Sequence, residues 1–92
     1  MAKTKEEYIG QWKELKEMTK GFSMDDIREK FDGDITNDLT EKDGMGKGME
    51  MIDLNYKDIL VTFFGKEVAS IGEYIECYDE NDNFIEVMKV ED

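Results

Sequence analysis

The chain has 92 residues with 24 acidic and 12 basic side chains, and its net charge of −12 disfavours direct binding to nucleic acid or an anionic membrane. It has no histidine, the commonest general base and metal ligand, and its one cysteine can form no internal disulfide. No apolar run approaches the roughly 20 residues that span a bilayer, and the N-terminal residues lack the apolar segment of a signal peptide. We therefore expect one non-enzymatic domain over residues 1–92, in a reducing, cytoplasmic setting and without a metal or other cofactor.

The first third of the chain predicts two helices joined by a tight turn. Thr4 and Glu7 form a capping box, and apolar residues recur at helical spacing after it. Ser23, with Asp26 three residues later, can begin a second helix directly after the first one ends at a glycine. The predicted helices cover residues 5–20 and 24–31.

Residues 32–48 are polar, acidic and rich in glycine, which predicts a flexible connection. We expect at most one helical turn within it, near Ile35–Leu39. The glycines of residues 44–48 lack the spacing and the flanking strand of a phosphate-binding loop, so this stretch is interpreted as a linker.

From Met49 onwards the apolar residues recur with a period of two, which predicts an antiparallel sheet over residues 49–91. Turns are expected at Lys57-Asp58, at Gly65-Lys66-Glu67 and at residues 79–83, giving a four-stranded meander. Residues 66–78 also fit helical spacing, and the β-branched residues there favour a strand.

These turns fix a predicted register that brings the apolar residues onto one face of the sheet. The turn at 65–67 places Ala69 opposite Phe63 and Ile71 opposite Val61. The last turn pairs Tyr78 with Phe84, and the positions that follow from this pair are Cys77 beside Ile85, Glu76 opposite Glu86 and Ile75 beside Val87.

The predicted fold is α+β, with two N-terminal helices packed on one face of the four-stranded meander. The opposite face would carry many apolar and aromatic side chains with an acidic rim, which is typical of a surface that binds a partner. The alternatives are that part of residues 32–48 folds over this face, or that a homodimer buries it. The candidate partner-binding residues are Leu60, Phe64, Tyr74, Glu76, Tyr78, Phe84, Glu86 and Met88.

Two segments carry a resemblance to a known family. The segment Lys20–Phe31 resembles the helix junction of the β-lactamase inhibitory protein and of SmpA/OmlA-like small lipoproteins, with Phe22 and Ser23 in place of the family's Met and Thr. The segment Ile59–Ile71 is similar to their central hairpin. The resemblance implies a helix–turn–helix packed on a four-stranded antiparallel sheet, a binding or scaffolding role, and no functional residue for this chain.

Three functions are compatible with these features. The first is a small acidic module that binds a protein partner, or a second copy of itself, through the exposed sheet face. The second is an acidic inhibitor of phage or mobile-element type that imitates phosphates and acts on a basic nucleic-acid-binding protein, since the whole net charge lies in residues 32–92. The third is a carboxylate metal binder, although residues 32–38 and 79–83 lack the glycine and glutamate that an EF-hand loop requires.

Overall fold

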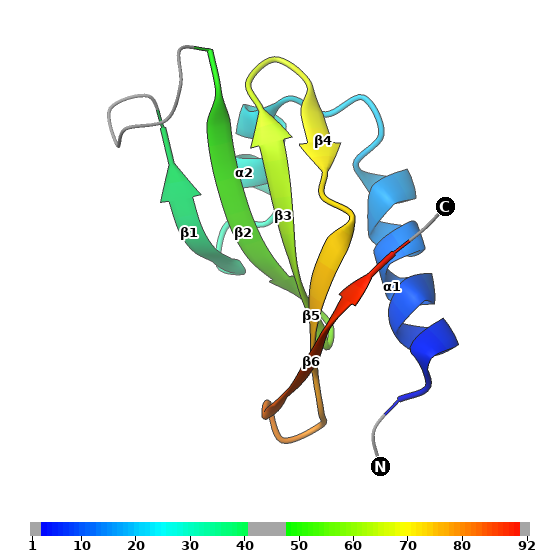
Figure 1. Cartoon of the computed structure of the whole chain (residues 1–92). Helices are drawn as coiled ribbons and strands as arrows, with labels where there is room; N and C mark the ends of the chain where they lie inside the picture. Colours follow the sequence, from blue (N-terminus) through cyan, green and yellow to red (C-terminus); the bar gives the residue numbers. More distant parts are fainter. Residues whose placement is uncertain (1–2, 41–47, 91–92) are drawn as a thin grey trace.

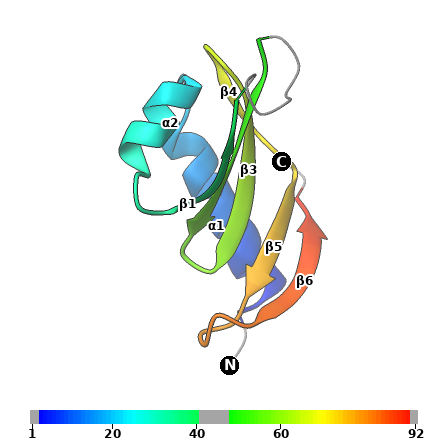
Figure 2. The same ribbon diagram turned by 90° about the vertical axis from the view of Figure 1, so that its left-hand side faces the viewer.

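The fold is α+β, with two helices and an open antiparallel sheet of six strands, in a computed structural model that describes residues 3–40 and 48–90 (Figure 1). Both helices pack against one face of the sheet; in Figure 2, α2 lies to the left of the strands and α1 runs behind them. The elements in chain order are α1 (Lys5–Met18), α2 (Met24–Lys30), β1 (Ile35–Leu39), β2 (Glu50–Tyr56), β3 (Ile59–Gly65), β4 (Ala69–Ile71), β5 (Tyr74–Tyr78) and β6 (Phe84–Lys89).

Both predicted helix starts are confirmed. The hydroxyl of Thr4 accepts a hydrogen bond from the backbone N–H of Glu7 at 3.2 Å, and the Glu7 carboxylate accepts one from the backbone N–H of Thr4. Ser23 and Asp26 make the same reciprocal pair at the start of α2. Each pair satisfies N–H groups that have no partner within the helix. Both helices end one or two residues earlier than predicted, at Met18 and Lys30.

The core lies between the helices and the sheet face that they cover. The indole N–H of Trp12 donates to the carbonyl of Gly72 at 2.8 Å, and the hydroxyl of Tyr8 donates to the carbonyl of Tyr78 at 2.8 Å. These bonds fix α1 against the chain on both sides of β5. The buried apolar side chains are Tyr8, Trp12, Leu15, Met24, Ile27, Phe31, Ile52, Leu54, Ile59, Val61, Phe63, Ile75, Cys77, Met88 and Val90.

The prediction of a helical turn within residues 32–48 is wrong, because Ile35–Leu39 forms the strand β1. This strand pairs antiparallel with β2, with Asp38 opposite Ile52. Three of its five residues are polar, so formation of strand β1 depends on pairing with β2 and on an ion pair between Asp38 and Arg28 of α2. Residues 41–47, seven of the 17 residues of the predicted connection 32–48, lie outside the described residues.

The prediction of a four-stranded meander is wrong in its number of strands, because the described residues form six strands. The sheet order is β1-β2-β3-β5-β6, and β4 pairs with β3 only. The turn at Lys57-Asp58 is as predicted, with Tyr56 opposite Ile59. Residues 66–78 contain two strands, β4 and β5, separated near Gly72, so the helical alternative is excluded.

The predicted register between β3 and β4 is wrong by two residues. Ala69 pairs with Gly65 and Ile71 pairs with Phe63. Gly65 lies at φ +131°, where a Cβ atom would clash with the carbonyl oxygen of Val68, so this turn requires glycine. An offset of two residues leaves every side chain on its predicted face.

Cys77 is free and fully buried. Burial, with a contribution from the charge of Glu86, raises the pKa of the Cys77 thiol to about 11. Only the thiolate reacts with alkylating reagents. We therefore expect iodoacetamide at pH 8 to modify the native protein at least about a hundredfold more slowly than the denatured chain, where the pKa is about 8.5. Mass spectrometry of quenched samples measures both rates, and equal rates would show that Cys77 is accessible.

Among the described residues, no helix is long and apolar enough to cross a membrane.

Candidate protein-binding face

The sheet face opposite the helices is covered by no described helix or strand (Figure 2). Alternation along β3 and β5 sends Phe63 and Ile75 into the core, and the residues beside them point to the other side. The register aligns this outer set across strands, with Leu60 opposite Glu76 and Glu76 opposite Val87. We define the open face by the side chains of Leu60, Phe64, Tyr74, Glu76, Tyr78, Phe84 and Val87.

The apolar side chains of the open face are large and exposed. The exposed fraction is 61% for Tyr74, 57% for Val87, 56% for Phe84 and 39% for Phe64. The rings of Tyr78 and Phe84 pack edge to face with their centroids 6.0 Å apart. Tyrosine and phenylalanine offer large contact areas with few rotatable bonds, and extended apolar patches are rare on surfaces that face only water.

The structure places six predicted residues on this face, namely Leu60, Phe64, Tyr74, Glu76, Tyr78 and Phe84. The predictions for Met88 and Glu86 are wrong. A register shift after the pair Tyr78–Phe84 places Met88 opposite Ile75, where it is only 8% exposed, and places Glu86 opposite the buried Cys77.

The same register shift corrects two further predictions. Cys77 and Ile75 do not pair with Ile85 and Val87, and Glu76 faces Val87 rather than Glu86. The predicted cross-strand pair of two glutamates is therefore absent from this pair of strands. Val87, which the sequence interpretation assigned to the core, is an exposed member of the open face.

Two carboxylates on this side of the sheet are held by neighbouring side chains. Glu76 accepts a hydrogen bond from the hydroxyl of Tyr78 at 2.8 Å, and this bond is the main cause of the raised pKa of Tyr78. Asp53 of β2 accepts from the hydroxyl of Thr62 at 2.5 Å and from the side-chain amide of Asn37 at 3.4 Å. Fixed carboxylates of this kind present hydrogen-bond acceptors to an incoming basic group.

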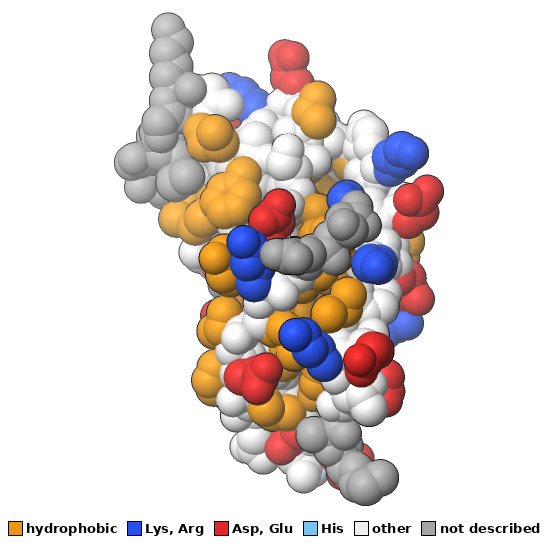
Figure 3. All heavy atoms as spheres, turned by 45° about the vertical axis from the view of Figure 1, so that its right-hand side comes forward, with side chains coloured by type: hydrophobic (Ala, Val, Ile, Leu, Met, Phe, Trp, Pro, Cys, Tyr) orange, Lys and Arg blue, Asp and Glu red, His pale blue; other side chains and the backbone are white. Residues whose placement is uncertain are grey.

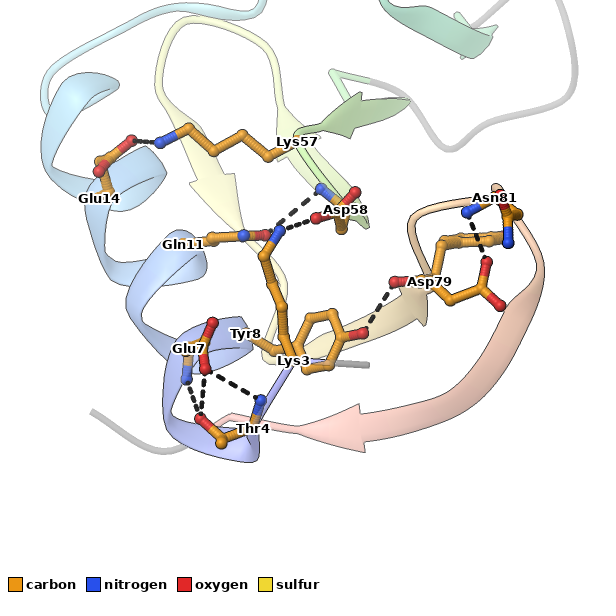
Figure 4. A network of polar contacts seen from close by, with 11 residues as sticks. Lys3, Thr4, Glu7, Tyr8, Gln11, Glu14, Lys57, Asp58, Asp79 and Asn81 are labelled. Carbon is orange, nitrogen blue, oxygen red and sulfur yellow. Dashed lines mark hydrogen bonds and ion pairs between the residues drawn. The ribbon is translucent and has the colours of Figure 1, made fainter. Parts of the chain in front are cut away.

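The turn between β5 and β6 extends the acidic character beyond the strands. Asp79 accepts hydrogen bonds at 2.9 Å from the backbone N–H groups of Asn81 and Asn83, which lower its pKa (Figure 4). The Asp79 carboxylate therefore stabilises the turn, and its oxygens are used as acceptors of these hydrogen bonds. No group of three or more histidine, cysteine, aspartate or glutamate side chains in residues 3–40 and 48–90 could hold a metal ion.

Basic side chains on the helix side are engaged in contacts with α1 (Figure 4). Lys57 in the β2–β3 turn pairs with Glu14 at 2.7 Å, and this contact is the main cause of the lowered pKa of Glu14. The hydroxyl of Tyr56 also donates to Glu14, and Lys3 pairs with Asp58. These contacts fix α1 over the β2–β3 turn, away from the open face.

A separate groove of about 340 Å³ lies between α1 and β4. Its charged lining residues are Lys16, Lys20 and Glu73, and its floor includes the core residue Trp12. Figure 3 shows this side of the molecule, where hydrophobic side chains are interspersed with basic and acidic ones.

No protein-family model matches the chain, and no curated protein or solved structure is significantly similar to it.

Proposed function

We propose that the protein is a non-enzymatic interaction module that binds a partner protein through the open face. The observation that supports this most is the exposure of Phe64, Tyr74, Phe84 and Val87 on one side of the sheet. Binding energy at protein interfaces is concentrated in a few large side chains, tyrosine prominent among them, surrounded by a polar rim. The open face has that composition, with Glu76 among its apolar side chains.

The setting that we propose is cytoplasmic, where the free thiol of Cys77 would stay reduced. The resemblance of Lys20–Phe31 to the helix junction of the β-lactamase inhibitory protein remains a prediction, and it points to the same class of function.

The second candidate is an inhibitor that imitates the phosphates of nucleic acid and occupies a basic nucleic-acid-binding protein. The net charge of −12 supports it. The two candidates differ in what the exposed rings do, because a charge mimic needs no apolar anchors. Loss of affinity on removal of Tyr74 or Phe84 therefore favours the interaction module.

The partner for the test is the protein that the wild-type chain captures at both low and high salt. The test compares the affinity of alanine variants for that partner with the affinity of wild type. We expect Tyr74→Ala and Phe84→Ala each to weaken binding about thirtyfold, which corresponds to about 2 kcal/mol. Met18→Ala is the control, because Met18 is an exposed apolar side chain (39%) at the end of α1, on the helix side of the sheet. Isothermal titration calorimetry gives the dissociation constants.

Unchanged affinity in both ring variants would contradict the proposal. If charge substitutions such as Glu76→Gln then produced the loss, the phosphate-mimic candidate would replace it.

A further inference from the structure

The two edges of the sheet differ in how they are protected. Edge strands expose unpaired backbone groups, and proteins guard them with polar residues, bulges or ion pairs. At one edge, β1 has the sequence Ile-Thr-Asn-Asp-Leu, a register irregularity, and an ion pair between Asp38 and Arg28. At the other edge, β6 pairs with β5 only and carries three exposed apolar side chains, Phe84, Ile85 and Val87.

The backbone phase of β6 follows from a hydrogen bond at its end. The N–H of Val90 donates to the carbonyl of Glu73 at 2.6 Å, on the β5 side. Backbone groups alternate in direction along a strand, so those of Met88 also turn toward β5 and those of Val87 and Lys89 turn outward. Val87 thus combines an outward backbone with a side chain that is 57% exposed on the open face.

We propose that β6 binds an extended, cationic segment of the partner protein, which adds a strand to the sheet. This inference rests on the proposed function, since it names the partner's chemistry at the open face. An added strand would form backbone hydrogen bonds with Val87 and Lys89 and would lay alternate side chains beside Phe84 and Val87.

Charge selects this occupant over a second copy of the chain. Two copies would each bring a net charge of −12 to the contact. Glu76 lies opposite Val87 on the open face, and the turn before β6 contributes the exposed carboxylate of Asp82. Three basic groups in the described part of the chain lie close to this edge. They are Lys89 at the end of β6, and Lys3 and Lys5 on the helix side near Ile85. A cationic strand would therefore lie beside Glu76, on a chain whose net charge is −12.

The probe is a fluorescent peptide of about six alternating lysine and valine residues, matched in length to the six residues of β6. Fluorescence anisotropy measures its binding at about 0.15 M salt, where long-range attraction is screened. We expect N-methylation of its backbone amides, which keeps charge and apolar surface but removes the hydrogen-bond donors on both edges of the peptide, to weaken binding at least tenfold. An alternating glutamate and valine peptide should not bind.

The protein side of the test is Val87→Pro, with Val87→Ala as its control. Proline removes the outward N–H without breaking a bond to β5, so this variant should melt close to wild type. We expect at least tenfold weaker peptide binding for Val87→Pro and a smaller loss for Val87→Ala. If Val87→Pro does not fold, the methylated peptide alone decides.

Several results would overturn the inference: no peptide binding, equal binding of the methylated peptide, equal binding of the acidic peptide, or a wild-type dimer in sedimentation velocity that Val87→Pro abolishes. Full affinity of Val87→Pro for the partner, together with weak binding by Tyr74→Ala, would also overturn it while leaving the proposed function intact. Failure of the proposed function itself would give a different result, namely unchanged partner affinity in Tyr74→Ala and Phe84→Ala.

Discussion

Trp12→Ala is expected to lower the free energy of unfolding by about 4 kcal/mol, because large-to-small changes of a buried tryptophan cost about 3–5 kcal/mol. Trp12 is 2% exposed in the centre of α1, and its indole N–H donates to the carbonyl of Gly72. The variant therefore opens a cavity between α1 and the sheet and leaves that carbonyl without its partner. A domain of 92 residues has a total stability of roughly 5–14 kcal/mol, so the loss is a large share of it.

Differential scanning calorimetry measures this effect, with an expected fall in melting temperature of about 15–30 °C. Lys13→Ala is the neighbouring control, since Lys13 is exposed on the same helix and its loss should change stability by less than about 0.5 kcal/mol. A Trp12→Ala variant that melts within a few degrees of wild type would mean that α1 does not pack as described.

Arg28→Ala is expected to cost about 2–3 kcal/mol, because removing one member of a partly buried ion cluster leaves the opposite charges uncompensated. Arg28 of α2 contacts Asp25 at 2.8 Å, Asp38 at 2.9 Å and Glu50 at 2.7 Å. Its hydrogen bonds, above all the one to Asp38, raise the pKa of the guanidinium, so Arg28 stays charged throughout. The side chain of Glu50 is only 13% exposed, so water screens it poorly.

This cluster joins α2 to the first residues of β2 and to β1, and its loss should act on β1 first. We expect hydrogen exchange of the amides in β1 to accelerate in Arg28→Ala more than exchange in β3. Arg28→Lys keeps the charge but not the two-pronged contact with Asp38, and should fall between wild type and alanine. Equal acceleration in β1 and β3 would mean that the cluster does not specifically hold the sheet edge.

Local signals in the sequence were sufficient for the helices and for two turns, at Lys57-Asp58 and at residues 79–83, where Tyr78 lies opposite Phe84 as predicted. Thr4 and Ser23 are followed three residues later by an acidic side chain, and this pattern is read without tertiary information. The Lys57-Asp58 turn is fixed by two alternating apolar runs on either side of it. Strand β1 has no such signal, because its polar sequence becomes a strand only through pairing with β2 and the contact with Arg28.

The face that each candidate residue occupies depends on how each register error affects side-chain direction. The error between β3 and β4 is two residues, so Ala69 and Ile71 still lie on the core side, as predicted. The bulge in β6 inserts one residue, so the positions after it exchange faces and Met88 becomes core. Apolar residues at 84, 85, 87, 88 and 90 fit both phases of a strand, and the sequence therefore could not locate the bulge.

Hydroxyl-radical footprinting of the protein with and without its partner, read by mass spectrometry, tests most directly whether the open face binds a partner. In the free protein we expect fast oxidation of Tyr74 and Phe84, and slow oxidation of the buried Tyr8 and Phe63 as internal references of the same residue types. Binding of the partner should protect Tyr74 and Phe84. Slow oxidation of Tyr74 and Phe84 in the free protein, or undiminished oxidation in the complex, would contradict an open face that binds a partner.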